Sequence, residues 1–323
     1  MFLVGMFFSI AIIWSSYSWI AMWVGVELNM IMFLSLIFMS KEFKKLNLEG
    51  AVKYFLVQVI GSMMLIFSFF FMFKGLNFMW GIMLASLGLK LGMAPLHFWF
   101  PEVVLMYSWD INFYLFTVQK LGPMIMMYYC FIMSLNNIYL LLILCSSMVG
   151  ALGGFMQMDF RKIMAYSSIS HMGWMMIGLL YYFKIWSLYF FIYLLLNYTL
   201  CYLFKKYNIN NFNTVMSNFS LSFNLKYMFL MLFFSLGGMP PFLGFYSKWM
   251  VIEGAMMMNM GSLMIIMILM VLLTLYYYLR MVWGGMLMSS PLNLMLMKVK
   301  ENYFLIMLNL TNVLALIFVI FFF

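Results

Sequence analysis

The chain has 323 residues, of which 67% are hydrophobic and only 8% are charged. Soluble domains carry about 25% charged residues, so this composition excludes a soluble enzyme, a nucleic-acid-binding protein and a disordered chain. The formal net charge of +9 comes from basic residues in short segments between long apolar runs. Because these runs are continuous and do not alternate in polarity as barrel strands do, we predict an all-α integral membrane protein.

Eleven segments are apolar over about 20 residues, the length that a transmembrane helix needs. In chain order they are 1–20, 22–40, 50–73, 76–95, 111–134, 138–157, 161–182, 185–204, 226–253, 261–285 and 302–323. The longest connection, 205–225, is polar and rich in asparagine. No segment has the composition of a separate soluble domain.

Basic residues of the connections fall mostly on one side of the predicted membrane. That side receives Lys41, Lys44, Lys45, Arg161, Lys162, Lys205, Lys206, Lys226, Lys298 and Lys300, and the other side receives Lys74 and Lys184. By the positive-inside rule, the N-terminus lies on the basic side and the C-terminus on the opposite side.

Methionine is unusually common, with 42 residues. A genetic code that reads AUA as methionine, as in animal mitochondria, explains this excess; the alternative is methionine as a flexible apolar filler. The three cysteines lie apart in apolar runs, so neither a disulfide framework nor a metal cluster is expected.

Two of the predicted helices are interrupted at matching places. Residues 91–95 (LGMAP) and 237–241 (GGMPP) pair glycine with proline in the fourth helix of two consecutive five-helix blocks. Because five is odd, the second block is inverted relative to the first, which predicts repeats over 1–134 and 138–285, followed by a single helix, 302–323. Interrupted helices at matching positions of inverted repeats indicate a transporter; chance is the alternative, because glycine and proline are common in membrane helices.

Four charged residues lie well inside the predicted helices: Glu27, Lys90, Lys120 and Lys248. A charge at the centre of a bilayer costs about 2.5–3.5 kcal/mol even on insertion scales. Each lysine lies near glycine and proline, where freed carbonyl groups and water can solvate an ammonium. Lys53 lies near a helix end, so for it a functional role and snorkelling to the interface are both open.

These charged residues have two interpretations. A buried amine can release its proton near neutral pH whereas a guanidinium cannot, so the lysines and Glu27 are suited to form a proton-conducting line. Alternatively, they form buried ion pairs that only fix helix packing. His171, which lies among hydroxyl side chains in 161–182, is a further candidate for the relay, or else a packing residue.

No cofactor-binding motif is present. His97 and His171 are the only histidines, and they have neither a nearby cysteine nor a nearby carboxylate that would complete a metal or haem site. Phosphate loops and dinucleotide fingerprints are also lacking. We therefore expect no metal and no cofactor in this chain.

Six segments together resemble a known family. They are 23–29 (WVGVELN), 49–58 (EGAVKYFLVQ), 90–102 (KLGMAPLHFWFPE), 119–123 (QKLGP), 161–174 (RKIMAYSSISHMGW) and 240–249 (PPFLGFYSKW). These segments are similar, in order and over nearly the whole chain, to the chain 2 family of mitochondrial NADH–ubiquinone oxidoreductase (respiratory complex I), whose members are antiporter-like subunits.

The resemblance implies two inverted five-helix repeats with broken helices, and eleven helices in animal forms. It also implies a proton-translocating role, with Glu27 paired to Lys90 on a broken helix, Lys120 central and Lys248 terminal. The basic side would be the matrix side of the mitochondrial inner membrane, and the C-terminus would face the intermembrane space.

NADH, FMN, iron–sulfur clusters and ubiquinone would bind elsewhere in the complex. The partners would be other membrane-arm subunits and lipids, with no nucleic acid. A free-standing cation/proton antiporter subunit and a purely structural membrane-arm scaffold remain the alternatives.

Overall fold

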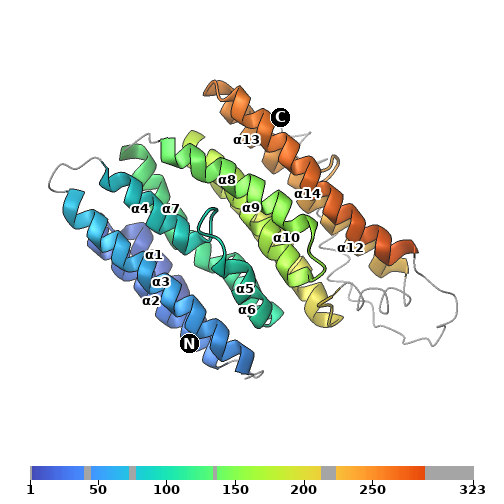
Figure 1. Cartoon of the computed structure of the whole chain (residues 1–323), viewed down its shortest axis with the longest axis horizontal. Coiled ribbons are helices and arrows are strands. Elements are labelled where there is room, and N and C mark those ends of the chain that lie inside the picture. The colour runs from blue at the N-terminus through green and yellow to red at the C-terminus, as the bar shows by residue number, and fades with distance from the viewer. Residues whose placement is uncertain (1, 40–44, 73–77, 134–136, 212–222, 288–323) are drawn as a thin grey trace. The chain divides into compact units, whose positions relative to one another are not determined.

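The computed structural model describes residues 2–39, 45–72, 78–133, 137–211 and 223–287. Over these ranges the regular structure is α-helical, with one isolated bridge between Asp159 and Asn211 (Figure 1). The predicted all-α class is therefore confirmed. The chain divides into two compact units, residues 1–149 with 168–173, and residues 150–167 with 174–323.

The first unit is built from seven helices and the start of an eighth. They are α1 (Phe2–Ser15), α2 (Trp19–Phe38), α3 (Lys45–Met72), α4 (Met79–Leu91), α5 (Trp99–Met106), α6 (Trp109–Phe116), α7 (Val118–Met133) and the beginning of α8 (Asn137–Phe155). Helix α2 packs against α1 and α3, and α7 packs against α4, so the helices that carry Glu27, Lys90 and Lys120 lie side by side (Figure 1).

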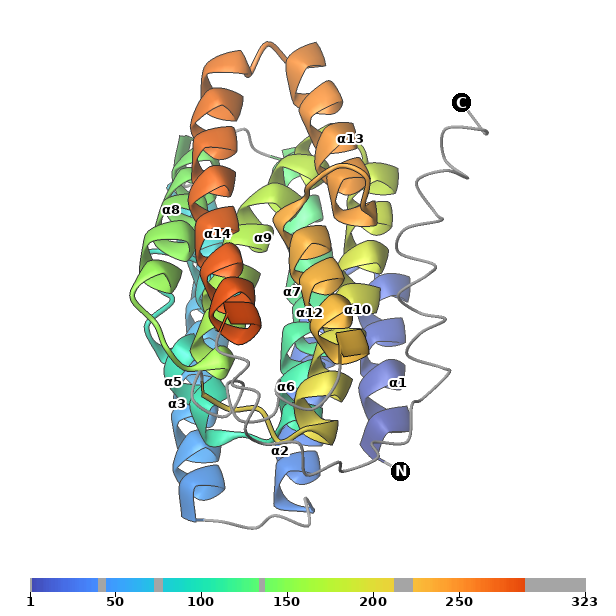
Figure 2. The same ribbon diagram turned by 90° about the vertical axis from the view of Figure 1, so that its right-hand side faces the viewer.

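The second unit contains the end of α8 and the helices that follow. These are most of α9 (Phe160–Tyr181), α10 (Phe183–Lys206), α12 (Phe223–Gly237), α13 (Leu243–Met257) and α14 (Gly261–Leu287). Helix α12 packs against α10, α13 and α14. A short turn at Met258–Met260 joins α13 to α14, which run side by side (Figure 2).

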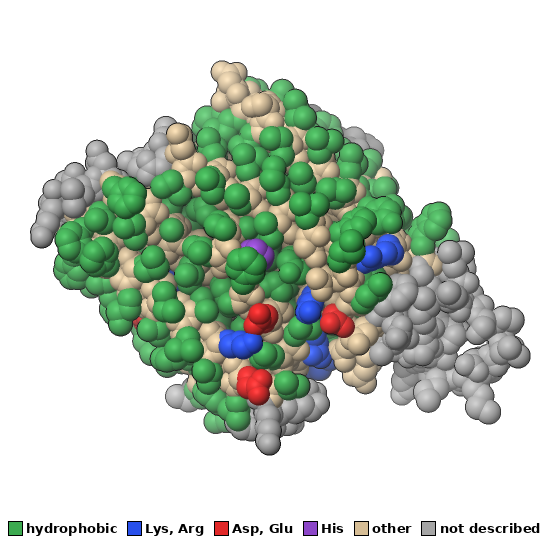
Figure 3. All heavy atoms as spheres, in the orientation of Figure 1, with side chains coloured by type: hydrophobic (Ala, Val, Ile, Leu, Met, Phe, Trp, Pro, Cys, Tyr) green, Lys and Arg blue, Asp and Glu red, His purple; other side chains and the backbone are tan. Residues whose placement is uncertain are grey.

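Six of the described helices are long and apolar enough to cross a membrane. They cover Trp19–Phe38, Leu46–Met72, Asn137–Phe155, Phe160–Tyr181, Phe183–Lys206 and Gly261–Trp283. Hydrophobic side chains also dominate the surface that Figure 3 shows, where a lipid environment would place them. The shorter apolar helices include α1 and α4. The predicted helix 302–323 lies outside the described residues.

Both predicted interruptions are present, and they have the same geometry. Helix α4 ends at Gly92 (φ +70°) and α12 ends before Gly238 (φ +78°). At each break, the glycine N–H donates to the carbonyl three residues back, and the following methionine N–H donates to the carbonyl five residues back. A left-handed glycine closes a helix end in this way, and a cis peptide bond before Pro95 or Pro241 follows in each case.

The broken helices end within the thickness of a membrane. Helix α4 has 13 residues and α12 has 15, so at 1.5 Å per residue each is only about 20 Å long, whereas a hydrocarbon core is about 30 Å thick. Irregular backbone at this depth is tolerated only where protein or water covers it. The breaks therefore provide polar backbone groups inside an otherwise apolar body.

Two predicted segments have wrong bounds, and one helix was not predicted. The segment 1–20 ends at Ser15, because Ser18 accepts a hydrogen bond from the Ala21 N–H and starts α2. The segment 111–134 is two helices, separated at Thr117, whose hydroxyl bonds back to the Phe113 carbonyl. Pro123, which lies downstream in α7, also disfavours a straight helix through this region. Helix α5, after the first break, was not among the predicted segments.

Candidate functional site

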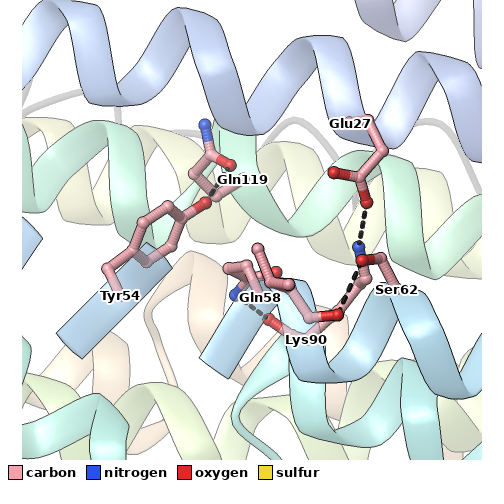
Figure 4. Close-up of polar contacts among 7 residues, drawn as sticks. Glu27, Tyr54, Gln58, Ser62, Lys90 and Gln119 are labelled. Carbon is pink, nitrogen blue, oxygen red and sulfur yellow. Dashed lines mark hydrogen bonds and ion pairs between the residues drawn. The ribbon is translucent and has the colours of Figure 1, made fainter. Parts of the chain in front are cut away.

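A buried ion pair joins α2 to the end of the broken helix α4. Lys90 Nζ lies 3.2 Å from Glu27 Oε1; the Lys90 side chain is fully buried and that of Glu27 is 18% exposed. Figure 4 shows the two side chains pointing toward one another. Lys90 is in the last turn of α4, where the negative end of the helix dipole also favours a cation. The structure thus brings together two of the predicted residues.

Helix α3 packs closely around Lys90. A side chain in place of Gly61 would lie 3.0 Å from Lys90 Cγ, so the absence of a side chain there makes room for the lysine stem. Gln58, one turn earlier, donates from Nε2 to the Lys90 carbonyl at 3.2 Å (Figure 4). The break leaves this carbonyl without a helical partner, and Trp99 Nε1 likewise donates to the neighbouring Leu89 carbonyl.

Lys120 is the third residue of α7 and is 2% exposed. Its Nζ lies 3.5 Å from the Ser168 carbonyl and 5.5 Å from the centre of the Phe100 ring. Phe100 belongs to α5, so Lys120 contacts the helix that follows the first break. The first unit therefore holds two buried lysines with different surroundings, a carboxylate for Lys90 and carbonyl and aromatic groups for Lys120.

Lys248 lies in the second unit, on α13, and is 6% exposed. Its Nζ donates to the carbonyls of Gly237 and Leu236, at 2.8 and 3.3 Å, and lies 6.0 Å from the centre of the Trp174 ring. These are the last carbonyls of α12, which the break leaves without helical partners. Lys248, on α13 after the break, thus caps the C-terminal end of α12 before the break. The carbonyl dipoles at that end stabilise its charge.

His171 is 7% exposed and lies in the middle of α9. His97, also 7% exposed, lies between α4 and α5, with Nδ1 3.3 Å from the Pro95 carbonyl. Over the described ranges, no three His, Cys, Asp or Glu side chains come together in a way that could hold a metal ion.

A polar connection that sequence reasoning missed joins three helices of the first unit. The Tyr54 hydroxyl on α3 donates to Gln119 Oε1 on α7 at 2.8 Å (Figure 4). Gln119 Nε2 in turn donates to Asn29 Oδ1 on α2 at 3.3 Å. Gln119 precedes Lys120, and Asn29 follows Glu27 by two residues. Amide groups are poor proton carriers, so this connection fixes the helices that hold Glu27 and Lys120.

The second ion pair of the first unit lies at its surface. Lys53 Nζ on α3 is 2.6 Å from Glu102 Oε2 on α5, and the two side chains are 45% and 58% exposed. The sequence identified Lys53 as a candidate functional residue. It did not identify Glu102 as its partner, because 49 residues separate the two.

The comparisons with known proteins agree on the class. A sequence model of the NADH:quinone oxidoreductase/Mrp antiporter transmembrane family matches residues 16–79 and 74–274. Among solved structures, the fold is similar to a chain of respiratory complex I from Thermus thermophilus with bound aureothin, with a TM-score of 0.82 and 19% identity over 97% of this chain and 77% of that one. It is also similar to a chain of the Mrp complex from Dietzia sp., with a TM-score of 0.75 and 14% identity over 88% of this chain and 59% of that one.

Curated relatives narrow the class further. NADH-ubiquinone oxidoreductase chain 2 of Anopheles gambiae is 34% identical over 93% of this chain and 89% of its own length. The chain 2 protein of Lemur catta is 38% identical over 87% and 83%. The chain therefore belongs to the NADH:quinone oxidoreductase/Mrp antiporter family of membrane proteins and, within it, to the NADH-ubiquinone oxidoreductase chain 2 family.

Proposed function

We propose that this chain translocates protons as a membrane-arm subunit of respiratory complex I. The observation that carries the proposal is the buried Lys90–Glu27 pair at the end of a half-helix, within an antiporter-like fold. Buried ionisable residues at a helix break are the arrangement of ion sites in transporters. In this complex, electrons pass from NADH to ubiquinone in other subunits, and this chain converts the energy released there into proton movement.

The proposed proton line consists of Glu27, Lys90, Lys120 and Lys248, with His171 as a further relay. While Glu27 faces Lys90, the carboxylate stabilises the ammonium. When a conformational or electrostatic change separates the pair, the ammonium loses its counter-charge and gives up its proton. Lys120 lies beyond the break and is the next acceptor in the first unit, and Lys248 is the terminal acceptor in the second.

The proposal includes the finer organisation of the chain. Two inverted five-helix repeats, 1–134 and 138–285, precede a final helix, 302–323, which makes eleven transmembrane segments. The matching geometry of the two breaks supports the repeat. The chain lies in the mitochondrial inner membrane, with the basic segments and the N-terminus in the matrix and the C-terminus toward the intermembrane space.

The partners follow from the same proposal. They are the neighbouring antiporter-like and small membrane-arm subunits, together with lipids. FMN, iron–sulfur clusters, NADH and ubiquinone bind in other subunits. The contribution of this chain to the NADH:ubiquinone reductase is translocation, without a redox site of its own.

Lys90→Met tests the proposal directly. Methionine fills a similar volume but cannot carry a proton. The carboxylate that it leaves unpaired, Glu27, is 18% exposed, so we expect the complex to assemble and to pump fewer protons per electron. The measurement is the proton-to-electron ratio of the purified complex in vesicles, beside native-gel quantification of assembly. An unchanged ratio in a fully assembled complex would show that Lys90 carries no proton.

Lys120→Arg separates the need for a charge from the need for proton release. Guanidinium keeps the positive charge near the Ser168 carbonyl but does not deprotonate. We therefore expect normal assembly with proton pumping reduced to the level of Lys120→Met. Lys184→Arg, at an exposed lysine in the first turn of α10, is the control and is expected to have no effect. Normal pumping by Lys120→Arg would leave Lys120 with an electrostatic role only.

The similarity to an Mrp complex favours one alternative function, that of a free-standing cation/proton antiporter subunit. Gentle solubilisation, a native gel stained for NADH dehydrogenase activity and mass spectrometry of each band distinguish the two. Migration with the large NADH-oxidising band supports the complex I subunit, and migration apart from it supports the antiporter.

A further inference from the structure

Lys90 is held at both ends, by its backbone and by its ammonium group. Gln58 Nε2 on α3 donates to the Lys90 carbonyl at 3.2 Å, and Lys90 Nζ lies 3.2 Å from Glu27 Oε1 on α2 (Figure 4). Gln58 is buried, and Lys90 is the last residue but one of α4. The two contacts come from different helices, so the position of this lysine depends on both of them.

The contact with Gln58 has a counterpart at the second break. In each break, the carbonyl two residues before the left-handed glycine accepts a hydrogen bond from a side chain. At the first break this is the Lys90 carbonyl, and its donor is the amide of Gln58. At the second it is the Leu236 carbonyl, and its donor is the ammonium of Lys248, at 3.3 Å. The same carbonyl position therefore has a neutral donor in one break and a charged donor in the other.

A neutral donor suits the first break because a charged one would disturb the ion pair. An ammonium on the Lys90 carbonyl would lie close to the buried Lys90–Glu27 pair, where it would repel the lysine and compete for the carboxylate. A glutamine amide donates the same hydrogen bond without adding a charge. Gln58 thus satisfies the end of α4 while the Glu27 carboxylate stays paired with Lys90.

The face of α3 that carries Gln58 also receives the side chain of Lys90. A side chain in place of Gly61 would lie 3.0 Å from Lys90 Cγ and 3.4 Å from its Cε. Residues three apart lie on the same face of a helix, so this face of α3 contacts both the backbone and the stem of one lysine. A movement of the last turn of α4 away from α3 would change the distance from Nζ to Glu27 as well.

Loss of the Gln58 donor would leave the buried Lys90 carbonyl without its side-chain partner. An unsatisfied buried carbonyl is unfavourable, so the last turn of α4 would move until the group found water or another donor. Ion-pair contacts extend only to about 4 Å between nitrogen and oxygen. The Lys90–Glu27 distance is already 3.2 Å, so a displacement of roughly 1 Å separates the pair.

We propose that Gln58 is a positioning residue for Lys90. Through its hydrogen bond to the Lys90 carbonyl, it fixes the last turn of α4 so that the ammonium lies opposite Glu27. The inference rests on the proposed function, and it names the group that sets the distance between these two ionisable residues. Gln58 itself carries no proton, because its amide side chain is neutral.

Gln58→Met tests the inference in the assembled complex. Methionine keeps the length of the side chain but has no N–H group to donate to the Lys90 carbonyl. We expect the complex to assemble and its proton-to-electron ratio in vesicles to fall by most of the loss that Lys90→Met causes. A normal ratio overturns the inference. If Gln58→Met does not assemble, Gln58→Asn takes its place, because it keeps the amide but is one methylene shorter.

A double variant distinguishes positioning from packing. Because Gln58 acts through Lys90, adding Gln58→Met to Lys90→Met should lower the ratio no further than Lys90→Met does alone. A further loss would reveal a packing defect that is independent of Lys90, and would contradict the inference. Ser68→Ala is the control on the same helix. Ser68 is fully buried, but its hydroxyl donates to the Leu65 carbonyl within α3, so the ratio should stay normal.

Lys90→Met, measured alongside, separates a failure of this inference from a failure of the proposed function. If Lys90→Met lowers the proton-to-electron ratio and Gln58→Met does not, only the positioning role is wrong. If neither variant lowers the ratio, the proposed function is wrong as well.

Discussion

Gly244→Ala is expected to abolish assembly of the chain into its complex. Gly244 lies in the first turn of α13, immediately after the second break, and a β-carbon there would overlap the Ser235 carbonyl oxygen of α12 and lie 2.7 Å from its carbon. Backbone cannot rotate away as a side chain can, so the two half-helices would have to separate. Overpacking in cores typically costs 1–3 kcal/mol, and a clash between two backbones exceeds that range.

Quantitative native gels with antibody or mass-spectrometric detection measure this loss. Gly261→Ala is the matched control in the same unit, because its nearest neighbour would be Met256 Sδ at 3.8 Å, an ordinary contact. Gly261→Ala should therefore assemble fully. Normal amounts of Gly244→Ala complex would mean that α12 and α13 do not approach as closely as described.

Glu27→Gln is expected to reduce both assembly and proton pumping. The change leaves the fully buried Lys90 side chain without its carboxylate. Removing one partner of a buried pair typically costs about 3–5 kcal/mol, since the remaining charge is uncompensated. The lysine can avoid that cost only by giving up its proton, and then it no longer alternates between two charge states. Either route stops proton transfer through Lys90.

A second substitution separates stability from function. Lys90→Met in the Glu27→Gln background removes the uncompensated charge, so we expect assembly to recover toward normal while pumping stays low. Glu253→Gln, at an exposed carboxylate of α13, controls for the loss of an acidic group and should change neither property. Full pumping by Glu27→Gln, or an assembly defect that Lys90→Met does not relieve, would contradict the proposed role of the pair.

Sequence reasoning predicted the helical class and both breaks. Apolar runs can only be helices in lipid, and glycine followed by proline cannot continue one, so these features follow from local chemistry. The interruption of 111–134 at Thr117 and the short helix α5 were missed. Thr117 alone does not mark a helix end, and α5, with eight residues, is too short to be recognised as an apolar span.

The charged residues of the candidate site, and the pairing of Glu27 with Lys90 that the resemblance implies, could be predicted, but the polar contacts around them could not. A buried charge is conspicuous in an apolar sequence, which is why Glu27, Lys90, Lys120 and Lys248 stood out. Gln119 and Tyr54 are ordinary polar residues, and their contact joins α7 to α3 across 65 residues. Only the three-dimensional arrangement reveals such a partner.

The two units neutralise their buried lysines by different chemistry. Glu27, which faces Lys90, is a side-chain carboxylate and places a full negative charge opposite the ammonium. The Gly237 and Leu236 carbonyls that face Lys248 are peptide groups and have no proton equilibrium in the physiological range. The first lysine therefore faces a full charge on a side chain, whereas the second faces the partial charges of the backbone at a helix end. One substitution, at Glu27, removes the counter-charge of the first unit, whereas no substitution removes the backbone carbonyls that face Lys248 in the second.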